Sequence, residues 1–137
     1  MQRRTLALAC LMTALGAPMA PAQQTVAAEV TRAGSVQVTI HRHDFLNPQD
    51  LAVLQTIAGN DQARALFLGP EGDFAALALA PRDGLLDASG TGVQPTAQAV
   101  AQLPDADTAR ARALELCESA RRRGPACVVV LEVAPQR

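Results

Sequence analysis

The two histidines of this 137-residue chain lie two positions apart, and they are the first candidates for chemistry. In His41-Arg42-His43-Asp44, both imidazoles fall on one side of an extended chain, with a carboxylate beside them. Imidazole and carboxylate groups bind Zn²⁺ and Cu²⁺, so one hypothesis is an exported metal-binding protein that uses His41, His43 and Asp44. The alternative is a pair of exposed histidines at a strand end, because no third histidine completes a three-histidine site.

A small hydrolase is another hypothesis, although the usual nucleophile pattern is missing. The chain has three serines, and none of them lies in a G-x-S-x-G turn. Hydrolysis would therefore require a carboxylate beside His41 or His43 within a cleft. The loop carboxylates Asp83 and Asp87 do not have the spacing of a calcium-binding EF-hand. We predict no catalytic residue and no cofactor, which favours a non-catalytic protein.

Cysteine usage predicts one disulfide. Cys10 lies in the apolar N-terminal run, which leaves Cys117 and Cys127 as a pair. In an exported protein, such a pair is expected to be oxidised. Closing this short loop is worth about 2.5–3 kcal/mol by the loop-entropy estimate. The bond would join the end of a helix to the start of a strand.

The first 22 residues have the layout of a secretory signal peptide. Arg3 and Arg4 precede an uncharged apolar run over residues 5–17, and Ala20-Pro21-Ala22 is a small-x-small cleavage site. The apolar run is shorter than the roughly 20 residues that a membrane-spanning helix needs. We therefore expect export to the periplasm or beyond, cleavage near Ala22, and no membrane attachment of the remaining chain.

Charge and composition restrict the function further. The formal net charge is −1, which argues against nucleic acid as a partner. All twelve basic side chains are arginine, and without lysine no Schiff base with pyridoxal phosphate can form. Arg121, Arg122 and Arg123 stand together at a predicted helix end. They either stabilise that helix end through its dipole or bind an acidic protein or envelope partner.

Hydrophobic periodicity and turn residues predict one α+β domain over residues 34–137, after a flexible segment over residues 23–33. The expected strands cover residues 35–41, 74–80, 99–101 and 126–133. One helix is expected to begin at a cap at Asn47, and a second, short helix at a cap within Gly59-Asn60-Asp61, with Ala63, Leu66 and Phe67 on its buried side. A third helix is expected over residues 105–122, and a long loop over residues 82–93. The fold would be a small, mostly antiparallel sheet of three to five strands, with the first and last helices on one face. The predicted core includes Leu77, Leu79, Leu116, Val128 and Val130.

The C-terminal segment over residues 109–135 (ARARALELCESARRRGPACVVVLEVAP) resembles the end of a group of small exported bacterial proteins of unknown function. The shared pattern is a helix ending in AL..C, an Arg/Gly loop and a CVVVLEV.P strand; residues 74–81 and 103–105 also fit. Some members carry the label 5-aminolevulinate synthase, which implies pyridoxal phosphate bound through a lysine. This chain has no lysine, so that label would be a misnaming here. The sequence favours an exported accessory domain that binds a protein or envelope component through one exposed patch, at Arg121 to Arg123 or in the loop over residues 82–93.

Overall fold

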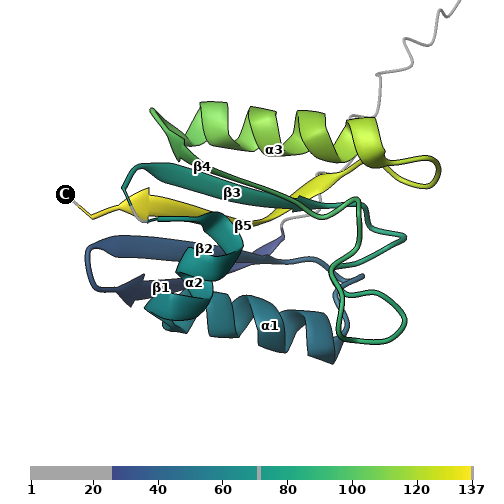
Figure 1. The fold of residues 1–137 in the computed structure, drawn as a ribbon, viewed down its shortest axis with the longest axis horizontal. Coiled ribbons are helices and arrows are strands. Elements are labelled where there is room, and N and C mark those ends of the chain that lie inside the picture. Colours follow the sequence, from purple (N-terminus) through teal and green to yellow (C-terminus); the bar gives the residue numbers. More distant parts are fainter. Residues whose placement is uncertain (1–25, 71, 137) are drawn as a thin grey trace, which may run out of the picture.

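The computed structural model describes residues 26–70 and 72–136, so the predicted signal peptide over residues 1–22 lies outside the described residues. Five strands form one sheet in the order β1-β2-β5-β3-β4, and every neighbouring pair is antiparallel. The strands are β1 (Ala27–Ala33), β2 (Val36–Arg42), β3 (Phe74–Leu79), β4 (Gln98–Leu103) and β5 (Val128–Pro135), and the helices are α1 (Pro48–Gly59), α2 (Asp61–Leu68) and α3 (Ala106–Ala120). The predicted α+β fold is confirmed (Figure 1).

Strand β5 occupies the centre of the sheet, between β2 and β3. Val130, Leu131 and Val133 of its mostly apolar run are buried, as a central strand requires. The register against β3 shifts by one residue, since Leu77 pairs with Leu131 and Ala78 pairs with Val129. Val130 is therefore the extra residue of a β-bulge, and it packs into the same core cluster as Leu131.

The helices cover opposite faces of the sheet, which corrects the prediction that both long helices share one face (Figure 1). Leu77 and Leu79 of β3 pack in one cluster with Leu54 and Ile57 of α1. The alternate residues Ala76, Ala78 and Ala80 pack in a second cluster with Ala109, Ala113 and Cys117 of α3. Small side chains on both surfaces let α3 lie close to the sheet. The sequence pattern did not reveal this, because alanine patches look weakly apolar.

Three of the five predicted core residues are buried, and two are only half-buried. Leu77, Leu79 and Val130 are buried as predicted. Leu116 lies beside the buried stripe of α3 and Val128 begins β5 at the end of the sheet, so both keep partial exposure.

Strand β1 occupies most of the segment that was predicted to be flexible. Residues Ala27–Ala33 pair in register with β2, from Ala27 opposite Arg42 to Ala33 opposite Val36. Gly34 makes the connecting turn with a φ of 59°, a conformation that glycine adopts without strain. β1 is an edge strand that largely faces solvent, so its sequence does not show the alternation of apolar residues that marks a half-buried strand. For that reason the strand was not predicted from the sequence.

Helices α1 and α2 begin at the predicted caps. Asn47 accepts a hydrogen bond from the Asp50 backbone N–H at 2.8 Å, and Asn60 accepts one from the Ala63 N–H at 2.8 Å. The predicted buried side of α2 is wrong for Leu66, which is 81% exposed. Arg64 is buried instead, because its guanidinium donates to the carbonyls of Ile57 and Ala58 at the end of α1.

Asp50 fixes the long loop between β3 and β4. Its buried carboxylate accepts hydrogen bonds from the backbone N–H groups of Leu85 and Leu86, at 3.1 and 3.2 Å. Gly84 makes this approach possible: its φ is 73°, and a β-carbon there would lie 2.7 Å from Asp50 Oδ2. A bridge between Leu86 and Val93 then closes the loop on itself.

Replacing Asp50 with alanine should lower the free energy of unfolding by about 2–4 kcal/mol, because two backbone N–H groups lose their acceptor. Chemical denaturation measures the change. The matched control is Asp44→Ala, an exposed carboxylate whose removal should change stability by no more than about 0.5 kcal/mol. A similar small change for both variants would show that Asp50 does not hold the loop.

Candidate functional site

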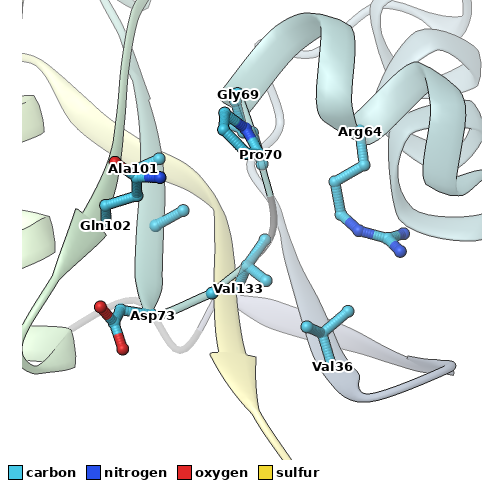
Figure 2. A pocket seen from close by; sticks show the side chains of 11 residues that line it. Val36, Arg64, Gly69, Pro70, Asp73, Ala101, Gln102 and Val133 are labelled. Atoms are coloured by element: carbon cyan, nitrogen blue, oxygen red, sulfur yellow. The ribbon is translucent and has the colours of Figure 1, made fainter.

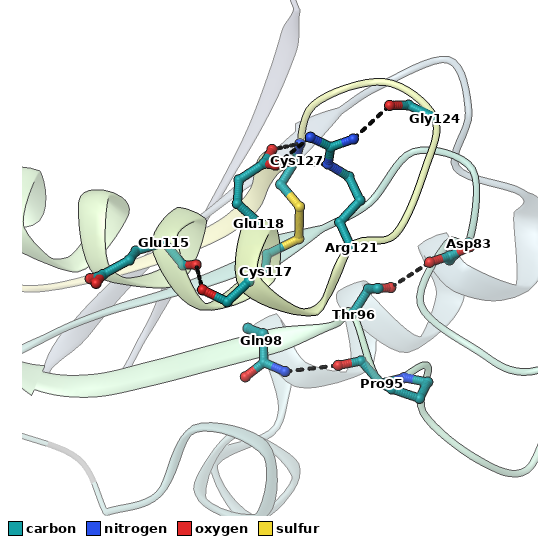
Figure 3. The surroundings of a disulfide bond; sticks show 11 residues. Asp83, Pro95, Thr96, Gln98, Glu115, Cys117, Glu118, Arg121, Gly124 and Cys127 are labelled. Atoms are coloured by element: carbon teal, nitrogen blue, oxygen red, sulfur yellow. Dashed lines mark hydrogen bonds and ion pairs between the residues drawn. A yellow bond between two sulfur atoms is a disulfide. The ribbon is translucent and has the colours of Figure 1, made fainter.

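The disulfide joins the last turn of α3 to the residue before β5, as predicted. The sulfur atoms of Cys117 and Cys127 are 2.00 Å apart. Inside the closed loop, the Glu118 carboxylate accepts hydrogen bonds from the Cys127 N–H at 2.5 Å and from Arg121 Nε at 2.7 Å (Figure 3). The hydrogen bond from Arg121, followed by that from the Cys127 N–H, lowers the pKa of Glu118. Arg121 also donates to the Gly124 carbonyl, so this arginine helps to build the loop.

The other two arginines of the run are exposed and have no such role. Arg122 and Arg123 form no ion pair or side-chain hydrogen bond within residues 26–70 and 72–136, and neither does Arg82. Arg82 lies against the same loop, since a β-carbon on Gly124 would be 3.2 Å from Arg82 Cβ. The structure therefore brings together two segments that the sequence offered as separate candidate patches.

An open groove of about 620 Å³ runs between the end of α3 and the segment that leads into β4. We call it the arginine groove, and its lining residues are Asp83, Gln94, Pro95, Thr96, Ser119, Ala120, Arg122 and Arg123. Asp83 is the only carboxylate among these, and it accepts a hydrogen bond from Thr96 Oγ1 at 2.9 Å (Figure 3). Two guanidinium groups in the lining, with Arg82 nearby, outweigh that single negative charge.

The histidines have separate partners, and both lie on β5. His41 Nε2 donates to Glu132 Oε2 at 2.5 Å, whereas His43 Nε2 donates to the Val129 carbonyl at 3.0 Å. The His43 ring also stacks on Phe45. Within the described part of the chain, no three His, Cys, Asp or Glu side chains form a group that could hold a metal ion. The structure thus does not gather His41, His43 and Asp44 into one ligand set.

Glu132 is the centre of a charged network on the α3 side of the sheet. Its second carboxylate oxygen accepts a hydrogen bond from Arg110 at 2.8 Å, and Arg110 also pairs with Asp107. The hydrogen bond from His41 is the largest cause that lowers the pKa of Glu132, and the contacts with Arg110 lower it further. His41 therefore does have the carboxylate that a hydrolase would need, yet this pair lines neither the arginine groove nor the hollows described next.

Three further hollows lie at other places on the surface. A cavity of about 20 Å³, enough for one water, lies between the end of α2, β4 and β5 (Figure 2). A groove of about 370 Å³ lies near Gln136, where β1 and β5 end and β2 begins. An apolar groove of about 340 Å³ lies on the face that α1 and α2 cover, and its lining residues are Leu66, Phe67, Leu77, Leu85, Val93, Ala97 and Ala99. We call this last one the apolar groove.

The network around Glu132 should make the protein sensitive to acid. Because the folded state holds the pKa of Glu132 below its ordinary value, the stability that this carboxylate provides is complete above that value. It is lost as the pH falls from about 5 towards 3, through the lowered pKa. Glu132→Gln should therefore lower stability at pH 7 and flatten the fall in unfolding free energy between those pH values. Glu115→Gln, at an exposed pair with Arg112, is the control and should leave the curve unchanged. An unaltered acid slope in Glu132→Gln would contradict this account.

Comparisons with protein-family models, with curated proteins and with solved structures found no match. Within the described residues, no helix has the length and apolar character needed to cross a membrane. The arginine groove is the surface whose chemistry suggests a function most directly, because its two arginines form no ion pair with the other described residues.

Proposed function

We propose that the protein is an exported accessory domain that binds an anionic part of a protein or envelope partner in the arginine groove. Export is supported by the signal-peptide layout of residues 1–22, and an oxidised cysteine pair is compatible with it. The observation that carries the binding function is the gathering of Arg82, Arg122 and Arg123 beside one groove, where they are exposed and form no ion pair with any other described residue.

The helix dipole accounts for only part of this gathering. Arg122 and Arg123 follow the C-terminus of α3, where a positive charge stabilises a helix by a few tenths of a kcal/mol. Arg82 comes from the loop after β3, and it is brought to the same place by tertiary structure. Like charges held together cost stability unless something negative approaches them. A guanidinium fork suits carboxylate and phosphate groups, so an anionic partner is the chemical class that the groove fits.

A labelled hexaglutamate peptide provides the direct test, with fluorescence anisotropy as the readout. Arg122→Gln combined with Arg123→Gln should weaken binding at least tenfold at low ionic strength, because both cations that line the groove are removed. Added salt should also weaken binding to the unaltered protein. The control is Arg112→Gln, on the exposed side of α3, where the arginine already pairs with Glu115. Equal losses in the control and the double variant would mean that net charge, and not the groove, attracts the peptide.

Asp83→Asn is an independent test, because it should raise the affinity for hexaglutamate, whereas the arginine variants should lower it. The amide oxygen can still accept the hydrogen bond from Thr96, whereas the negative charge in the groove is gone. Affinity for hexaglutamate should rise about threefold, as expected for removing one partly solvated repulsive charge. A decrease would place the peptide away from Asp83 and would count against the groove.

A further inference from the structure

Strand β4 is an edge strand that borders both the arginine groove and the apolar groove. It is last in the sheet order, and its outer edge pairs with no other strand of the described residues. Pro95 and Thr96, just before β4, line the arginine groove. Ala97, directly before β4, and Ala99, near its start, line the apolar groove. The same short stretch of chain therefore forms a wall of both grooves.

The two grooves lie on opposite faces of the sheet. Ala99 pairs with Leu77 of β3, and directly paired residues share a face, so both point to the side of α1 and α2. The arginine groove lies on the other side, against the end of α3. A strand added to the edge of β4 would point its successive side chains towards the two grooves in turn.

The apolar groove has exposed apolar side chains at its rim. Leu66 is 81% exposed and Val93 is 47% exposed. They are two of the three large apolar side chains that stand exposed among the described residues, and the third is Val30 on β1 at the far edge of the sheet. Large apolar side chains that gather in this way typically mark an interaction surface.

We propose that the anionic partner is an extended polypeptide strand that pairs with the outer edge of β4, with acidic and apolar side chains in alternation. This inference rests on the proposed function and specifies its partner. Acidic side chains would face Arg122 and Arg123, which form no ion pair within the part of the chain that the structure describes. Apolar side chains would lie between Leu66 and Val93, and backbone hydrogen bonds to β4 would supply affinity that does not depend on sequence. Charge complementarity selects this occupant over an apolar ligand, which would leave the arginines unpaired.

Three peptides of equal length distinguish this inference from simple attraction of charge. In the first, Glu and Leu alternate; the second has the same composition in two blocks; in the third, Glu and Ser alternate. Binding of the Glu–Ser peptide tests the proposed function alone. The inference expects the alternating Glu–Leu peptide to bind at least tenfold more tightly than both others. Equal affinities for the three would overturn the strand proposal while leaving anion binding intact, and no binding by any of them would overturn both.

Variants and a modified peptide test the two halves of the proposed contact. Leu66→Ser should lower the affinity for the alternating Glu–Leu peptide at least fivefold and leave the affinity for the Glu–Ser peptide unchanged. Because Leu66 is exposed, the variant should fold normally. Arg122→Gln with Arg123→Gln should lower the affinity for both peptides.

Backbone pairing is tested with a modified peptide and by hydrogen exchange. N-methylation of the alternating Glu–Leu peptide on its pairing edge should abolish its higher affinity. Binding of the unmodified Glu–Leu peptide should protect the amides of β4 from hydrogen exchange. Unchanged protection of β4, or an undiminished affinity after N-methylation, would exclude strand pairing. Self-association of the protein that the peptide does not displace would assign the edge to a second copy of the chain instead.

Discussion

The burial of β5 from both faces is the constraint on which the rest of the structure depends. This strand is apolar except for Glu132, and a strand of that kind is stable only when strands flank it and layers cover it above and below. Strands β2 and β3 supply the flanks, while α3 covers one face and α1 with α2 covers the other. The disulfide adds a covalent connection between this strand and α3, in a domain whose core contains few aromatic side chains. The edges β1 and β4 are what remain free once this requirement is met.

Two buried charged residues, Arg64 and Asp50, hold backbone segments in place through hydrogen bonds. Arg64 satisfies the carbonyls at the end of α1, and Asp50 satisfies two backbone N–H groups of the loop between β3 and β4. Among the described residues, every buried side-chain nitrogen or oxygen has a hydrogen-bond partner. The loop is thus held in place by a specific acceptor, and buried Thr96 holds the exposed Asp83 carboxylate in a fixed arrangement through its hydrogen bond.

The arginine run shows how tertiary contacts divide residues that look equivalent in the sequence. Arg121, Arg122 and Arg123 were one candidate patch on the basis of charge alone. In the fold, Arg121 donates hydrogen bonds to Glu118 and to the Gly124 carbonyl, whereas Arg122 and Arg123 line the groove. Arg82 joins them from 40 positions earlier in the chain, and no local pattern indicates that approach. The histidine pair shows the reverse: His41 and His43 looked like joint ligands, yet β5 supplies each with its own partner.

Local chemistry was enough to determine most of the elements of this protein. The caps at Asn47 and Asn60, the alternation in β2, the apolar run of β5 and the cysteine pair each act over a few residues, and each was predicted correctly. Tertiary structure decided what depends on distant contacts: the edge strand β1, the helices on opposite faces, the burial of Arg64 in place of Leu66, and the groove formed by two separate segments. The physical reason is that solvent-facing edges, alanine-lined interfaces and unpaired charges leave little trace in hydrophobic periodicity. Which of these residues are buried, paired or exposed depends on the neighbours that folding places beside them.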